Sequence, residues 1–451
     1  MASDVELLEV FRLGEAARDA DIVREVGNRL ANQWLRVSRF RDVDALTSRS
    51  LRVQSSPVTL VGAGRAQEAT GNLPAALDYY EQALPALREV GDRAGEAGTL
   101  NNIGSVHLRR GAGQSALDYF EQALSIYREV GDRAGVASTV NNIGLVHARH
   151  GAWEAVQVNY EQALVIQREV GDRASEAITL NNIGMVYGRR GDEQGSLNYF
   201  EQALPILREV GDRAGEANTL SNIGAARAHL GDGLAALDYY RRALAIRREV
   251  GDRAGEANTL NNIGMVHDRR GDGQAALRYF QHALPISREV GDRAGEAITL
   301  NNIGRVHAER GDAQAALDNY EQALPVLLEV GDRVGAATTI YNIGSVHANG
   351  GDEQAALDYF ERSLPILREV GDRAGEATVR YHIASVHLGA GRLDEAIAEL
   401  ELAQALDAAV EHPDLEEGRS MLEQVRKLAS RGSMGGPDAG EAGDGGGGVS
   451  V

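Results

Sequence analysis

The sequence contains no cysteine and a single lysine, Lys427. Without cysteine the chain can form neither a disulfide framework nor a thiolate metal site. No stretch approaches the roughly 18 consecutive apolar residues of a membrane span. The opening MASDVELLEVF is acidic and lacks the basic segment and long apolar run of a signal peptide. We therefore expect a soluble, cytoplasmic protein that does not bind membranes, and the dominance of arginine over lysine hints at a bacterial genome of high GC content.

Basic charge is also scarce, because the net charge is −20. This argues against nucleic acid as a partner, since neutralising phosphates needs a basic face. No Ser/His/Asp constellation, phosphate-binding loop or His-Glu-x-x-His motif is present. The sequence therefore predicts no enzymatic activity and no cofactor.

The chain does contain one sequence unit that is repeated at a fixed period. Residues 131–170 recur almost unchanged when the frame is shifted by forty residues, and the core Asn-Asn-Ile-Gly returns at Asn101, Asn141, Asn181, Asn261 and Asn301. A fixed period of this length is typical of a solenoid, in which each unit buries its apolar flank against the next.

Each unit is predicted to form two antiparallel helices. In residues 131–170, Gly131 suits the left-handed residue that ends a helix, and Asp132 can cap the next one. Helix A is expected from about Arg133 to Arg149 and helix B from about Trp153 to Val170. A column of prolines inside helix B predicts a kink or short break there, because proline removes a backbone hydrogen bond. These prolines are Pro85, Pro205, Pro285, Pro325 and Pro365.

The spacing of these positions resembles the tetratricopeptide repeat (TPR). The turn glycine Gly111 is preceded by Leu100, Ile103, Gly104 and His107 and followed by Ala116, Phe120 and Ala123. The forty-residue form exceeds the family's usual 34 or so residues, and it is similar to the extended repeats of LGN/Pins adaptors and of bacterial multi-repeat proteins. The resemblance implies an all-α right-handed superhelix, a TPR α-solenoid of antiparallel helix pairs.

Departures from the repeat suggest four segments. Residues 1–56 are expected to hold N-terminal helices with a degenerate capping repeat, and the first 20 residues to form a helix with little to dock it. Residues 57–410 read as nine TPR-like repeats, and residues 411–430 as a C-terminal capping helix. Residues 431–451 read as a disordered glycine-rich tail, since they offer no apolar face to bury.

A column of histidines raises the question of a metal site. Equivalent residues in adjacent units lie at least one helix spacing apart, about 8–10 Å, whereas each zinc ligand sits about 2 Å from its metal. The column also coincides with the packing tyrosine of the TPR pattern. We therefore interpret these histidines as packing residues and predict no metal. They are His107, His147, His267, His307, His347 and His387.

Two polar columns on helix A are the predicted binding residues. In TPR domains that bind extended peptides, the position of the second asparagine lines the concave groove and bonds the peptide backbone, so the resemblance implies this role for Asn102, Asn142, Asn182, Asn222, Asn262, Asn302 and Asn342. Two turns further on the same face come Arg109, Arg149, Arg189 and Arg269, placed to meet carboxylates. Duplication alone would also copy solvated Asn and Arg residues into every unit, so a second interpretation treats both columns as copied surface.

These observations favour a non-enzymatic scaffold or adaptor that binds an extended, acidic peptide segment of a partner protein. The alternative is a bacterial sensor or regulator that changes its superhelical conformation when it binds a signalling peptide. The sequence leaves the partner, the pathway, the repeats used and the oligomeric state open.

Overall fold

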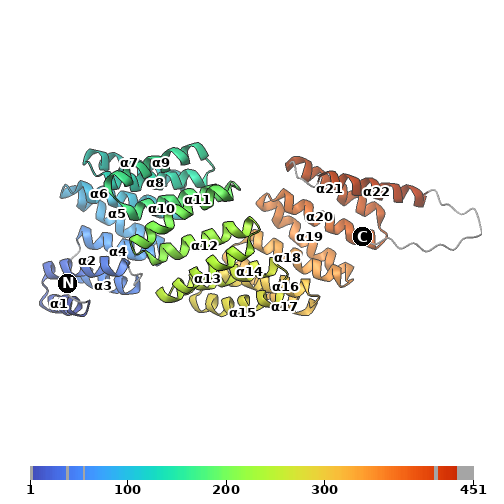
Figure 1. Ribbon diagram of the computed structural model, residues 1–451, viewed down its shortest axis with the longest axis horizontal. Coiled ribbons are helices and arrows are strands. Elements are labelled where there is room, and N and C mark those ends of the chain that lie inside the picture. The colour runs from blue at the N-terminus through green and yellow to red at the C-terminus, as the bar shows by residue number, and fades with distance from the viewer. Residues whose placement is uncertain (1–3, 37–39, 54–55, 411–414, 434–451) are drawn as a thin grey trace, which may run out of the picture. The chain divides into compact units, whose positions relative to one another are not determined.

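The computed structural model describes residues 4–36, 40–53, 56–410 and 415–433, in which every regular element is an α-helix (Figure 1). The chain divides into two units, Met1–Leu230 and Gly231–Val451. The first unit contains α1 (Asp4–Ala17), α2 (Ala20–Arg36), α3 (Phe40–Val53), α4 (Pro57–Ala69), α5 (Leu73–Glu89), α6 (Arg93–Arg109), α7 (Gly113–Glu129), α8 (Arg133–Arg149), α9 (Trp153–Val170), α10 (Arg173–Arg189), α11 (Glu193–Glu209) and α12 (Arg213–His229). The second contains α13 (Gly233–Val250), α14 (Arg253–Arg269), α15 (Gly273–Val290), α16 (Arg293–Glu309), α17 (Ala313–Val330), α18 (Arg333–Asn349), α19 (Glu353–Val370), α20 (Arg373–Gly389), α21 (Leu393–Val410) and α22 (Leu415–Ser433).

The helix boundaries follow from the glycine and aspartate that separate the helices. Gly131 adopts φ 73°, the left-handed conformation that suits glycine. Asp132 then caps α8, where its Oδ1 accepts a hydrogen bond of 2.9 Å from the backbone N–H of Gly135. The predicted bounds of helices A and B in this repeat are confirmed, since α8 spans Arg133–Arg149 and α9 spans Trp153–Val170.

From α4 to α21, the even-numbered helices are helices A and the odd-numbered ones are helices B. In seven repeats the two pack through a glycine on helix A that meets an aromatic ring on helix B, as Gly184 of α10 meets Phe200 of α11. The other glycines are Gly64, Gly104, Gly144, Gly264, Gly304 and Gly344. Helices A of successive repeats also contact one another inside each unit, for example α6 with α8 and α16 with α18. They form one continuous surface in each unit, which we call the A-helix face.

The expected break at the proline column is wrong. Helices α5, α11, α15, α17 and α19 run through their prolines without interruption. Pro85 is exposed, and Glu81, whose carbonyl loses its partner, is exposed as well. Water can satisfy that carbonyl, so the missing hydrogen bond is tolerated without breaking the helix.

The two ends of the chain are covered by extra helices. Phe11 of α1 is fully buried in a cluster with Leu30 of α2 and Val43 of α3, so the expectation that the first helix has little to dock it is wrong. At the other end α22 places Leu422 and Val425 on Leu400 of α21, and it runs to Ser433, beyond the expected boundary at residue 430. Residues 411–414 and 434–451, the latter expected to be disordered, lie outside the described residues.

Consecutive repeats are also joined by ion pairs around a buried glutamate. Glu96 of α6, with 5% of its side chain exposed, binds Arg88 at the end of α5 at 2.7 Å and also Arg93. Arg93 reaches Glu129 at the end of α7 at 2.7 Å. A buried glutamate holds the same place, between two arginines, in five more repeats, at Glu176, Glu216, Glu256, Glu296 and Glu376.

These glutamates predict an acid-sensitive part of the stability. Burial alone would raise the pKa of Glu96, Glu216, Glu256 and Glu376, but hydrogen bonds from the arginines outweigh it and hold each pKa below 4.5. Because the unfolded chain then binds protons first, their contribution is present above pH 4.5 and is lost as the pH falls through the folded pKa values. The fourfold Glu→Gln variant should therefore lose less thermal stability than the parent between pH 6 and pH 3.5, roughly the window that the lowered pKa values imply.

The matched control replaces four exposed glutamates of helices B by glutamine, at Glu81, Glu121, Glu161 and Glu321. Thermal unfolding followed by circular dichroism at both pH values compares the three proteins. An equal drop in the midpoint for the buried and the exposed variants would show that the buried ion pairs do not set the acid sensitivity.

Candidate functional site

The predicted asparagine column lies on the A-helix face and is half-buried in every repeat. In three repeats its side chain reaches back to the preceding helix A. The Nδ2 of Asn142 donates to Oδ1 of Asn101 at 3.3 Å, Asn182 donates to Asn141 at 3.2 Å, and Asn302 donates to Asn261 at 3.1 Å. These amides are therefore held in a row that runs from one helix A to the next.

The first asparagine of each pair, which the sequence analysis did not select, is the acceptor in this row. Its Oδ1 also accepts a threonine hydroxyl from the next repeat: Thr179 donates to Asn141, Thr219 to Asn181 and Thr339 to Asn301, each at 3.0 Å. The signal for this role was the strict Asn-Asn pairing together with a threonine two residues before it. The first asparagine thus fixes the orientation of the second.

The arginine column lies at the C-terminal ends of helices A, and two of its members bind the preceding helix. Arg109 Nη1 donates to the carbonyl oxygen of Glu68 at 2.6 Å, and Arg149 Nη1 donates to that of Leu108 at 2.5 Å. Each of these carbonyls lies in the last turn of its helix and also accepts the backbone N–H of the following glycine, Gly71 or Gly111. A cation at this end of a helix is favourable. Each guanidinium carries five N–H donors, and the remaining ones are available to another acceptor. Arg269 occupies the same position on α14 and is exposed.

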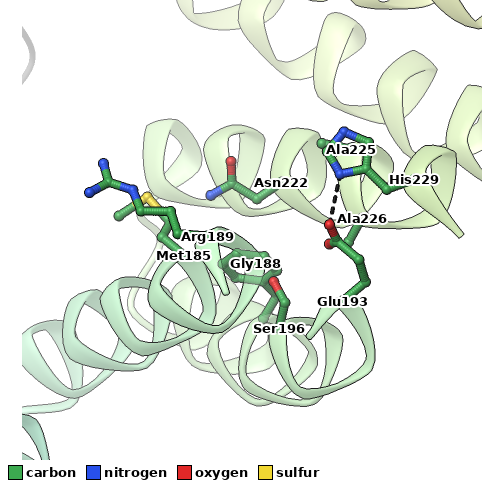
Figure 2. Close-up of a pocket in the computed structure, with 10 residues that line it drawn as sticks. Met185, Gly188, Arg189, Glu193, Ser196, Asn222, Ala225, Ala226 and His229 are labelled. Carbon is green, nitrogen blue, oxygen red and sulfur yellow. Dashed lines mark hydrogen bonds and ion pairs between the residues drawn. The ribbon is translucent and has the colours of Figure 1, made fainter. Parts of the chain in front are cut away.

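Arg189 and Asn222 meet at a cavity of about 400 Å³ between α10, α11 and α12 (Figure 2). Arg189 is exposed at its rim, and it has no hydrogen bond or ion pair among the described residues. At the other side of the cavity His229 Nδ1 lies 2.8 Å from Glu193 Oε1. One member of each predicted column is therefore brought to the same hollow, which single-residue patterns did not reveal.

The repeats match a known protein family. The tetratricopeptide repeat family model matches residues 95–167, 135–209, 215–289, 257–329 and 335–409, which together make up more than half of the chain. The chain belongs to the tetratricopeptide repeat family. No curated protein matches this TPR chain in sequence.

Three solved structures share the fold of this TPR protein. A STAND signal transduction ATPase with a tetratricopeptide repeat sensor, from Pyrococcus horikoshii, has a TM-score of 0.55 and 14% identity, over 85% of this chain and 54% of that one. The apo form of the quorum sensor NprR from B. thuringiensis has a TM-score of 0.52 and 13% identity, over 76% and 98%. The apo form of RapI has a TM-score of 0.50 and 18% identity, over 61% and 98%. At identities this low, the structural similarity shows a common fold and nothing more.

In this TPR protein the histidine column packs against helix B. His107 stacks on Tyr119 with ring centroids 5.2 Å apart, His267 stacks on Tyr279 at 5.3 Å, and Tyr187 takes the same place against Tyr199. Burial lowers the pKa of His107 and His267, which favours the neutral ring. The described residues hold no cluster of three or more His, Cys, Asp or Glu that could bind a metal. In the same part of the chain, no helix has the length and apolar character of a membrane span.

Proposed function

We propose that this TPR protein is a non-enzymatic scaffold that binds an extended, acidic segment of a partner protein along its A-helix face. The observation that carries the proposal is the row of side-chain amides formed by Asn142, Asn182 and Asn302, which we call the amide row. Asn142 and Asn182 each donate one side-chain N–H to the preceding repeat, and this hydrogen bond orients the side chain. Their Oδ1 atoms have no partner within the described residues, so an ordered acceptor and a second N–H remain for a ligand.

An extended peptide suits such a row because its backbone N–H and C=O groups are unpaired and recur at regular spacing. Asparagine offers a donor and an acceptor together, so it can bind peptide groups whatever their side chains. The row therefore supplies affinity with little choice of sequence. Because Asn142 and Asn182 are already oriented, little conformational entropy is lost when they bind.

The preference for acid comes from the arginine column. Arg189 has no hydrogen bond or ion pair in the part of the chain that the structure describes. Arg149 and Arg109 keep further donors after binding the helix ends, although the Glu68 carboxylate also lies 3.9 Å from Arg109. A chain with net charge −20 repels acidic partners at long range. The attraction must therefore act at contact distance, and it should weaken as salt rises because the arginines are exposed.

A sensor of a signalling peptide is the second candidate. The fold is shared with the quorum sensor NprR and with a STAND protein that carries a tetratricopeptide repeat sensor. A sensor changes conformation on binding, whereas a scaffold keeps it. Small-angle scattering with and without bound peptide separates the two, since only a sensor changes its radius of gyration.

Photo-crosslinking tests which face binds. The photoreactive residue p-benzoyl-phenylalanine replaces Met185 on the A-helix face or, as the matched control, Val165 on helix B; both are exposed, at 40% and 56%. The probe is a biotinylated peptide pool in which Asp or Glu alternates with random residues. We expect labelling from position 185 and little from position 165. Labelling from position 165 alone, or equal labelling from both, would place the ligand elsewhere.

A further inference from the structure

The cavity between α10, α11 and α12 exists because the chain departs there from its own repeat. Ala225 and Ala226 stand where the repeats on either side have Met185 and Val186, and Met265 and Val266. Gly188 stands where the two preceding repeats have Ala148 and Leu108. Smaller side chains on two helices therefore lie at one place. The hollow that they line opens to solvent, so a ligand can reach it, unlike an enclosed packing void.

The cavity has an apolar floor and a polar rim. Phe200, Ala225 and Ala226 line the floor, and Met185, with 40% of its surface exposed, lies beside them. Arg189 and Asn222 lie on one side of the rim, and the His229–Glu193 pair lies on the other (Figure 2). A volume of about 400 Å³ lies in the range of small-ligand sites, about 300–1,000 Å³.

We infer that this cavity is the specificity pocket of the A-helix face, and that it takes one large apolar side chain, Phe, Leu or Met, of a peptide whose adjacent residue is Asp or Glu. The inference rests on the proposed function. The floor offers burial to an apolar side chain. Asn222 belongs to the predicted asparagine column, so a peptide backbone held by that column passes directly over the cavity.

The rim charges set the direction in which the ligand lies. Arg189, which binds no other described residue, meets the carboxylate of the adjacent acidic residue. Glu193 is 16% exposed at the opposite side, and it repels a second acid there. The acidic residue therefore lies toward Arg189, and a neutral or basic residue follows toward Glu193.

The chain itself offers the substitutions that close the pocket. The double variant Ala225→Met with Ala226→Val restores the residues of the neighbouring repeats. Gly188→Leu closes it independently from α10, and a Cβ at Gly188 would lie no closer than 3.4 Å to Ser196 Oγ, so that variant should fold. The matched control, Ser105→Met, places the same side chain on α6, two repeats before α10 and away from the cavity.

The experiment measures retention of fluorescent protein on an array of Ser/Gly nonapeptides that contain Asp-X or X-Asp, where X is each amino acid, beside matched peptides in which Asn replaces Asp. We expect the parent and Ser105→Met to prefer Phe, Leu or Met over Ala at X by about tenfold. Both pocket variants should lose this preference and keep the requirement for Asp. Absence of the preference in the parent, or its persistence in both pocket variants, overturns the inference. If the parent retains peptides with and without Asp equally, while its preference at X is intact, the acidic-peptide proposal is overturned instead.

Discussion

Replacing Gly184 by leucine is expected to lower the stability of the α10–α11 repeat by about 1–3 kcal/mol through overpacking. A Cβ at this glycine would lie 2.6 Å from Cε1 and 2.7 Å from Cδ1 of Phe200. Phe200 is only 3% exposed, and it lines the cavity between α10, α11 and α12. A leucine at position 184 must therefore displace this ring toward the cavity or push α10 and α11 apart, and either change weakens the contacts of the repeat.

The measurement is the midpoint of urea unfolding followed by circular dichroism, combined with hydrogen exchange of α10 and α11. Exchange is needed because a long repeat array need not unfold in a single step. The matched control is Gly188→Ala, one turn along the same helix, where a Cβ meets nothing closer than 3.4 Å. There alanine should be neutral or stabilise by about 0.5–1 kcal/mol, since it disfavours the unfolded chain. Equal midpoints for the two variants would contradict the close-approach role of Gly184.

The helix pairs could be predicted from the sequence because the signals were local and repeated. A glycine with positive φ followed by a capping aspartate fixes each boundary between repeats, as Gly131 and Asp132 show. Gly184 holds the same place in its repeat as Gly104 in the pattern, and a small residue there permits the close approach that the contact with Phe200 shows. The family resemblance rested on the same positions, and the family match confirms it.

Two predictions failed because they depended on which side of a helix meets water. Pro85 breaks no helix, since both the proline and Glu81 face solvent. Phe11 docks α1 on α2 and α3, although the text of the first residues carries no repeat motif. Neither exposure nor a contact between non-repeating helices is visible in a periodic pattern.

The candidate site was predicted only as columns of single residues. The orienting role of Asn141 depends on contacts with Thr179 and Asn182 of the next repeat, and it became visible only when helices A were placed side by side. Likewise the cavity arises from small residues on helices α10 and α12, which the period places forty residues apart. The helix-end contact of Arg109 was hidden because its acceptor, the Glu68 carbonyl, is backbone.

Removing two members of the amide row is expected to abolish most peptide binding. Asn142→Ala with Asn182→Ala deletes the ordered acceptors and donors of two adjacent repeats. At about 0.5–1.5 kcal/mol for each hydrogen bond, and with one bond to the peptide counted for each asparagine, the loss amounts to at least about 1–3 kcal/mol, or roughly five- to 150-fold in affinity. Acidic and neutral peptides should lose affinity to the same extent, because the bonds go to the backbone.

The arginine variant should behave differently. Replacing Arg109, Arg149 and Arg189 by glutamine keeps a hydrogen-bond donor near the helix ends and removes the charge. Acidic peptides should then lose affinity while neutral ones keep it, and the remaining affinity should depend less on salt. This contrast separates binding of the backbone from recognition of side-chain charge.

The amide row itself is tested most directly by the affinity of fluorescein-labelled Asp-containing nonapeptides for the Asn142→Ala, Asn182→Ala variant, measured by fluorescence anisotropy. The matched control is Thr139→Val, which removes a buried hydroxyl bonded to the Gly135 carbonyl and leaves Asn141 and both outer amides in place. We predict a loss of at least about fivefold for the asparagine variant and little change for the threonine variant. Unchanged affinity in the asparagine variant, with its helical content intact, would contradict the account and leave the amide row as a purely structural link between repeats.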